Sequence, residues 1–117
     1  MSVKHVSSIV PAAVKDGVGV SRKILISPDE APNFTMRLFT IQPGGKMPKH
    51  TNLVEHEQFV LTGSANVGIG DEIFIVHQGD VVFIPADEPH WYKNDGEDAF
   101  EFLCLVPNKL DKTTILE

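Results

Sequence analysis

Residues 44–63 read GGKMPKHTNLVEHEQFVLTG and contain two of the five histidines of the chain, His50 and His56, with Asn52 between them. Side chains two and six residues apart on a strand point to the same face, so these three polar side chains would converge if the stretch is extended. Imidazoles and an amide on one face of a strand are typical of a metal site. Chance alignment is the alternative, because short motifs have many false positives.

The composition is that of an ordinary soluble chain with one domain. Its 117 residues are 42% hydrophobic and 22% charged, which is enough to bury a core. A net charge of -6, with singly scattered basic residues, argues against nucleic acid or an anionic membrane as partner. No apolar run reaches the roughly 20 residues of a membrane span. A single cysteine, Cys104, excludes an internal disulfide and favours a reducing, cytoplasmic compartment.

Short apolar runs between glycines and prolines predict an all-β fold. We expect a loop over 12–20, a break at 43–45 and a hairpin turn at 70–71, with strands at 3–10, 22–27, 33–42, 55–62, 65–70, 72–76, 80–84, 90–94 and 99–106. This spacing is typical of a sandwich or barrel. Within a single domain, residues 1–33 would supply N-terminal strands and a loop, 34–108 the barrel core, and 109–117 a tail with little signal.

The first polar stretch resembles the first motif of the cupin superfamily. That motif begins with a glycine, and five residues separate it from a first histidine. One residue then separates the first histidine from a second, three or four residues separate the second histidine from a glutamate, and six residues separate the glutamate from a final glycine. Here Gly44, His50, Asn52, His56 and Gly63 stand at these positions. Asn52 therefore replaces the second histidine, and His56 replaces the glutamate. The local sequence Glu55-His56-Glu57 is similar to that of a cupin subgroup in which a histidine at this position is the metal ligand.

A second stretch resembles the second cupin motif. Gly79, Pro85, His90 and Asn94 fit its spacing, whereas Asp87 replaces the usual glycine. The two motifs are separated by a short segment, as in small single-domain cupins of the cupin 2 type. An asparagine before Asp-Gly also commonly caps a turn with its side chain, so we expect a structural role for Asn94.

The resemblance implies a conical β-barrel, a double-stranded jelly roll, with one divalent transition metal ion inside (Mn, Fe, Ni, Zn or Cu). Carried over by position, the ligands would be His50, Asn52, His56 and His90. An asparagine at 52 either weakens the site or leaves a position open. Glu57 is an alternative to His56, but strand parity places it on the opposite face.

Alternation along the expected strands predicts the rest of the barrel interior. On the expected strands 55–62, 90–94 and 99–106, the residues that share parity with the histidines or lie opposite Glu101 would face inward, namely Gln58, Val60, Thr62, Tyr92, Phe100, Phe102 and Cys104. Cys104 is expected to be a small core residue. On strand 33–42 either Met36, Leu38 and Thr40 or Arg37, Phe39 and Ile41 could face in. We favour the first set because unpaired charge is rarely buried. An inward Arg37 would instead hold an anionic substrate.

We therefore predict that the substrate contacts Gln58, Tyr92, Phe102 and Met36. Two apolar stripes would face outward, Phe59 with Leu61 and Leu103 with Leu105. Such stripes indicate a covered surface, and a homodimer is the simplest cover.

Fold does not determine function, so two main possibilities stay open. The first is a metal-dependent enzyme, of dioxygenase, isomerase or lyase type, on a small anionic or oxygen-chelating substrate. Neutral histidine ligands retain the charge of the ion, which attracts such oxygen ligands. The second is a non-catalytic ligand-binding or sensing barrel with a weakened metal site. A barrel without metal, with the histidines packed as core, is a third possibility. No general base lies beside the expected ligands, which argues against proton abstraction.

Overall fold

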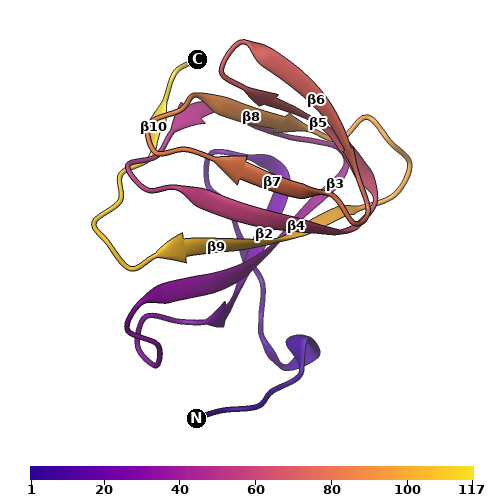
Figure 1. Cartoon of the computed structure of the whole chain (residues 1–117). Coiled ribbons are helices and arrows are strands. Elements are labelled where there is room, and N and C mark those ends of the chain that lie inside the picture. Colours follow the sequence, from indigo (N-terminus) through magenta and orange to yellow (C-terminus); the bar gives the residue numbers. More distant parts are fainter.

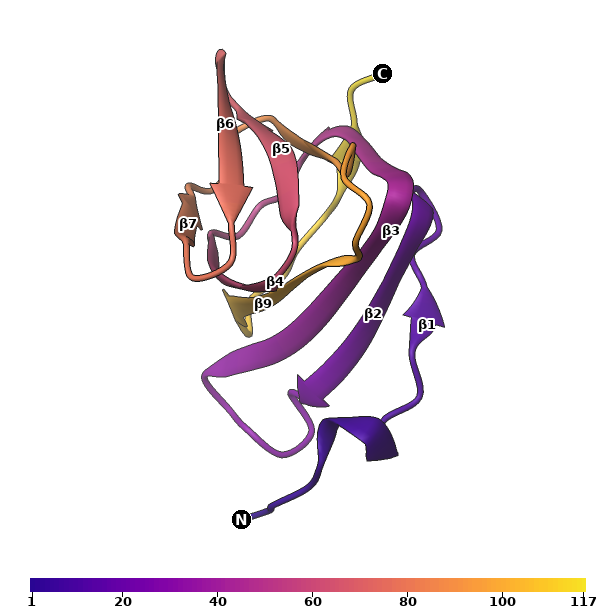
Figure 2. The ribbon, with the colours of Figure 1, turned by 90° about the vertical axis from the view of Figure 1, so that its right-hand side faces the viewer.

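The chain forms one antiparallel β-sheet that curls into a barrel, as seen from two sides in Figures 1 and 2. The computed structural model describes all 117 residues. A 3₁₀ turn (Val6–Ser8) precedes ten strands: β1 (Ala12–Ala13), β2 (Val18–Ile26), β3 (Phe34–Thr51), β4 (His56–Thr62), β5 (Ser64–Ile69), β6 (Glu72–His77), β7 (Val81–Ile84), β8 (His90–Lys93), β9 (Phe100–Pro107) and β10 (Thr114–Ile115). The predicted all-β class is confirmed. No helix is long and apolar enough to cross a membrane.

Strand β3 runs through both walls of the barrel. The strand order is β6-β5-β8-β3-β9-β4-β7. Residues 34–41 of β3 pair with β9, and residues 46–50 pair with β8. The predicted break at residues 43–45 is wrong, because the strand continues through them. Gly44 adopts a φ of 81° there, and the partner of β3 changes across this point.

The two ends of the chain differ from expectation. The predicted strand at 3–10 is wrong, since this segment contains only the short 3₁₀ turn and is almost fully exposed. Residues 12–20, expected as a loop, contain β1 and the start of β2. The tail contributes β10, whose Thr114 and Ile115 pair with Thr51 and His50 at the end of β3. That end has free backbone hydrogen-bonding groups, and the tail satisfies them.

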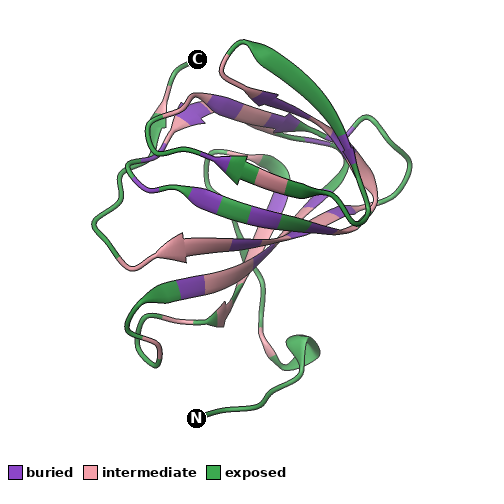
Figure 3. Ribbon diagram, in the orientation of Figure 1, coloured by how far each residue is buried: buried purple, intermediate pink, exposed green.

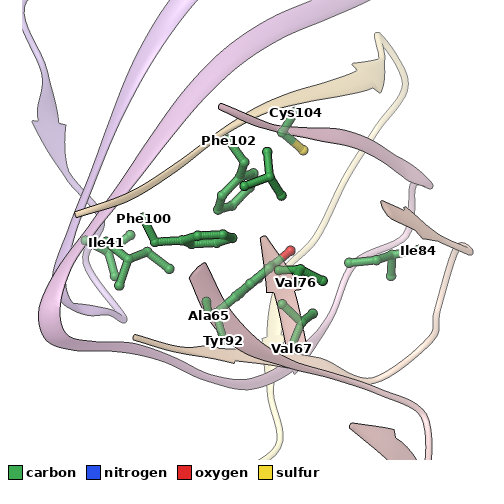
Figure 4. Packing of buried hydrophobic residues seen from close by; sticks show 11 residues of the cluster. Ile41, Ala65, Val67, Val76, Ile84, Tyr92, Phe100, Phe102 and Cys104 are labelled. Atoms are coloured by element: carbon green, nitrogen blue, oxygen red, sulfur yellow. The ribbon is translucent and has the colours of Figure 1, made fainter. Parts of the chain in front are cut away.

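The core lies between the curled walls. Eleven buried residues form one cluster: Val20, Ile41, Val60, Ala65, Val67, Val76, Ile84, Tyr92, Phe100, Phe102 and Cys104. Figure 4 shows Phe102 and Cys104 of β9 pointing into it. Along β4, buried and exposed residues alternate as predicted (Figure 3). Thr62 is the exception. It is exposed because the register between β4 and β9 shifts after Val60.

Asn94 has the structural role that its place before a turn predicts. It is completely buried, and its Nδ2 donates to the carbonyls of Ile41 and Asp98 at 2.9 Å each. Its Oδ1 accepts from the Gly96 amide. This side chain therefore holds the turn after β8 against the bend of β3.

A substitution at Gly63 is expected to destabilise the barrel more than the same substitution at Gly79. Both residues have a positive φ, 77° and 90°, and alanine in this region costs about 1–2 kcal/mol. A Cβ at Gly63 would also collide with the carbonyl of Ala99, whereas one at Gly79 would meet nothing within 4 Å. We expect Gly63→Ala to cost clearly more than Gly79→Ala in urea unfolding. Equal losses would contradict the close approach at Gly63.

Candidate metal centre

A cavity of about 560 Å³, counted out to its open mouth, occupies the barrel interior. Its wall combines apolar, imidazole, amide and guanidinium side chains and contains no carboxylate. The lining residues are Val14, Val20, Arg22, Arg37, Phe39, Ile41, Met47, His50, Asn52, His56, Gln58, His90, Tyr92, Phe102, Cys104 and Thr113. The side chains that line the cavity are therefore positive or neutral.

Three histidines come together on this wall. His50 near the end of β3 pairs directly with His90 at the start of β8, and His56 begins β4. The ring centroids of His50 and His90 are 4.1 Å apart, and those of His56 and His90 are 5.6 Å apart. All three are buried. The two stretches that the sequence singles out thus meet at one place in the fold.

Two of the rings are fixed by the backbone. His50 Nδ1 lies 2.7 Å from the Pro48 carbonyl, and His90 Nδ1 lies 2.9 Å from the Glu88 carbonyl. A carbonyl can only accept, so each Nδ1 must carry the hydrogen, and each Nε2 keeps its lone pair. This is the tautomer of a metal-binding histidine whose second nitrogen is held by a carbonyl.

The third ring has no such anchor. His56 Nδ1 is buried without a hydrogen-bond partner. Burial, together with the positive charge of Arg37, lowers the pKa of His56 to about 3. Burial and the neighbouring His50 lower the pKa of His90 to about 4, and burial also lowers the pKa of His50. All three imidazoles are therefore neutral at pH 7, the state that metal binding requires.

These donors fit a divalent transition metal in chemical type. They are neutral and buried, and two have a free nitrogen of defined tautomer. They do not form a ready-made cage, because no group of three or more His, Cys, Asp or Glu side chains is placed to hold an ion. Binding would require the rings to turn, and the unpartnered ring of His56 is the one that no hydrogen bond restrains.

Asn52 connects the histidine wall to the tail. Its Nδ2 donates to Asp111 Oδ2 at 3.2 Å and to Thr113 Oγ1 at 2.9 Å. Asp111 also accepts from the backbone amide of Leu53, and the Asn52 carbonyl accepts from the amide of Asp87. The amide nitrogen is thus engaged in holding the chain. Metal ligation by Asn52 stays a prediction that concerns its Oδ1 alone.

An aromatic stack forms the floor beside the histidines. The Tyr92 and Phe102 rings stack at 5.3 Å, and Phe102 stacks on Phe39 at the same distance. Gln58 Nε2 donates to the Tyr92 hydroxyl at 2.7 Å. Burial raises the pKa of Tyr92, so the phenol stays protonated. Gln58, Tyr92 and Phe102 all line the cavity. Their contact with substrate stays a prediction.

A family model described as the cupin domain matches residues 37–106. The chain belongs to the cupin family. The cupin-type barrel that the two motifs predict is thereby confirmed.

Solved and curated relatives of this cupin include enzymes. The polyketide cyclase RemF from Streptomyces resistomycificus superposes with a TM-score of 0.93 at 27% identity, over 100% of this chain and 86% of RemF. The 1-methylthio-D-xylulose 5-phosphate methylsulfurylase of Rhodospirillum rubrum is 28% identical over 80% of this chain and 59% of its own length. A mannose-1-phosphate guanylyltransferase of Salmonella muenchen is 31% identical over 61% of this chain but only 15% of its own length. The cupin thus spans less than two thirds of either curated relative.

The interior face of β3 in this cupin is the opposite of the one we favoured. Met36, predicted to contact substrate, is absent from the cavity wall, whereas Arg37, Phe39 and Ile41 line it. Arg37 pairs with Cys104 and Met36 with Leu105 on β9. Because directly paired residues share a face, the inward Cys104 fixes Arg37 inward. The prediction was wrong because it gave most weight to the charge of Arg37. The apolar residues Phe39 and Ile41, at alternate positions of the strand, indicated the inward face correctly.

Three further residues have informative positions. Glu57, the alternative ligand, is exposed and lines a separate outer hollow with Glu55. Arg22 on β2 lines the cavity, although nothing in the sequence marked it. Asp87, which replaces a motif glycine, has a φ of 66°. Asp87 therefore adopts the left-handed backbone conformation that favours glycine.

Removing the Asn52 amide should release the tail. We expect Asn52→Ala to cost about 1–2 kcal/mol, because it deletes two side-chain hydrogen bonds. The amide of Leu116, which donates to the Lys49 carbonyl, should then exchange its hydrogen faster. Asn66→Ala serves as a control, since it removes one exposed bond to Asp95 far from the tail. Unchanged exchange at Leu116 in Asn52→Ala would show that this side chain does not hold the tail.

Proposed function

We propose that this cupin is a cytoplasmic, metal-dependent enzyme in which His50, His56 and His90 hold one divalent transition metal ion. The observation that carries the proposal is the meeting of three buried, neutral imidazoles on a cavity wall, two of them fixed in the ligand tautomer. Asn52 Oδ1 is the proposed fourth ligand. The lone buried Cys104 is consistent with a reducing compartment.

A bound ion would supply Lewis-acid polarisation and, with neutral ligands, most of its positive charge. The substrate class that suits such a centre is small, oxygen-chelating and anionic. The stack of Phe39, Phe102 and Tyr92 offers it a flat apolar surface. The likeness to a polyketide cyclase and to an enzyme named for a sugar phosphate supports an oxygen-rich substrate.

The cavity residues limit the reaction type. No carboxylate lines the wall, and burial lowers the pKa values of the three imidazoles there, so no side chain on the wall is a strong base at neutral pH. Tyr92 accepts a hydrogen bond from Gln58, and its own hydroxyl proton is left to donate to a substrate oxygen. Proposed roles are therefore orientation by Gln58 and hydrogen-bond donation by Tyr92, within the dioxygenase, isomerase and lyase types of chemistry.

A second candidate function is a non-catalytic barrel that binds or senses a small ligand. Two observations favour it. The amide nitrogen of Asn52 is committed to the tail, and the donors are not gathered into a ready metal cage. The candidates differ in what happens to a cavity ligand. After incubation of small-molecule extracts, an enzyme converts a compound in the wild type but not in His90→Ala, whereas a binding barrel returns it unchanged.

Elemental analysis tests the metal directly. Protein purified without a histidine tag is expected to contain about one divalent transition metal ion per chain. His50→Ala and His90→Ala should lose it, because each removes a neutral, oriented ligand. His77→Ala is the matched control, since His77 is exposed and outside the cavity. Metal-free wild-type protein that takes up no added metal would refute the metal-dependent function.

We also propose that the cupin forms a homodimer. Large apolar side chains are exposed over β4, β6 and β7, namely Phe59, Ile75, Val81 and Phe83, with 43%, 67%, 77% and 57% of their surface accessible. Ile75, Val81 and Phe83 also line one shallow hollow. A second copy covering this β4–β6–β7 patch would bury it. The stripe of Leu103 and Leu105, predicted to need cover, is already half-buried.

Light scattering after gel filtration tests the dimer. We expect twice the chain mass for the wild type, and one chain mass for Val81→Asp combined with Phe83→Asp, because buried charge opposes association. Leu110→Asp, at an exposed apolar residue elsewhere, should leave the dimer intact. A monomeric wild type would refute the proposal.

A further inference from the structure

We propose that Arg37 and Arg22 form an anion-binding subsite on the β2–β3 wall of the cavity, where they hold a carboxylate or phosphate group of the substrate. This inference deepens the proposed function and rests on it for the metal-bound end of the substrate. The subsite itself is built from groups that need no metal.

Arg37 has more donors than partners. Its Nη2 donates to Cys104 Sγ at 3.1 Å, and its guanidinium lies 4.9 Å from the centre of the Phe39 ring. Its Nε is buried with no partner at all. A guanidinium carries five N–H donors in a planar fork that matches the oxygens of a carboxylate or phosphate. Arg37 therefore presents an unused recognition surface to the cavity.

Arg22 brings a second positive charge to the same wall. It pairs with Phe39, two residues along β3 from Arg37, so the two arginines share the inner face. Both line the cavity. Burial and the nearby charge of Arg37 lower the pKa of Arg22. Two like charges placed side by side repel each other, and an anion bound between them would remove that repulsion.

No protein acid neutralises this pair. The three ion pairs of the structure join Lys4 to Glu30, His77 to Asp80 and Lys93 to Asp95, all away from the cavity.

The sulfur contact of Arg37 does not replace an acid. Burial raises the pKa of Cys104, so the sulfur next to Arg37 is a neutral thiol and a weak acceptor. A half-buried guanidinium whose only partners are a thiol and an aromatic ring lowers the stability of the fold. An anionic ligand would supply the missing negative charge, which explains why an arginine stands at position 37.

The register places this subsite within reach of the histidines. Gln58 pairs with Cys104, and Cys104 pairs with Arg37, so the three lie in a row across β4, β9 and β3. Adjacent strands are roughly 4.8 Å apart, which puts the backbones of Gln58 and Arg37 at about 10 Å. His56 is two residues along β4. A compact molecule with chelating oxygens at one end and an anionic group at the other would reach both.

Inorganic phosphate added to metal-free protein tests the subsite alone. Calorimetry at low salt should detect binding to the wild type, and Arg37→Gln should weaken it by about tenfold or more, the usual loss for a hydrogen bond to a charged group. Arg22→Gln should also weaken it. Lys23→Gln is the charge-matched control and should have no effect, because Lys23 lies on the outer face and donates to the Val6 carbonyl.

A stability measurement separates ligand binding from a structural role. Without ligand, Arg37→Gln should melt at the same temperature as the wild type or higher, since it removes a half-buried positive charge that has no acidic partner. If Arg37→Gln does not fold, Arg22→Gln and Arg37→Lys carry the same test. Absence of phosphate binding to the wild type, or equal affinity in the arginine variants, would overturn the subsite.

A matched ligand pair tests the link to the metal end. Comenic acid and kojic acid share a chelating hydroxypyrone ring, and the first carries a carboxylate where the second has a hydroxymethyl group. Metal-loaded wild type should bind comenic acid at least about tenfold more tightly, Arg37→Gln should lose that preference, and His90→Ala should weaken both ligands. Phosphate binding without metal binding would support the subsite and refute the metal function. Metal binding without arginine-dependent anion binding would support the metal function and refute the subsite.

Discussion

The change of partner within β3 is the constraint on which the site depends. One continuous strand pairs with β9 over residues 34–41 and with β8 over residues 46–50. Its first half contributes Arg37 to the cavity, and its second half contributes His50. Both groups are thus fixed relative to each other through one backbone, and the bend at Gly44 sets the angle between the walls that carry them.

The sequence was sufficient wherever a local rule decides the structure. The two motifs and strand parity placed His50, His56, His90 and Gln58 on the cavity wall, because alternation on a half-buried strand follows directly from the side chains. The Asp-Gly pair that follows Asn94 likewise predicted its role as the cap of a turn. These positions depend on near neighbours along the chain.

Features decided by distant partners escaped the sequence. Arg37 faces inward because its register with Cys104 is set by another strand, and a charged residue there contradicts the usual preference for apolar interiors. The bulge that exposes Thr62 is likewise a property of two strands. The tail had no apolar pattern of its own, and its structure comes from the unpaired edge at Thr51 and His50 that it covers.

The hydrogen bonds of the tail also hold one part of the cavity wall in place. The contact of Glu117 with the Lys49 amide joins residues 68 positions apart, so it closes a loop that contains strands β4 to β10. Closing such a long loop loses conformational entropy. That loss is offset only when the strands within the loop are already paired. Few buried apolar side chains hold this segment, which gives it the character of a region that opens locally before the barrel does. Thr113 belongs to that segment and to the cavity wall. Local opening of this segment would therefore expose the part of the cavity wall that Thr113 forms.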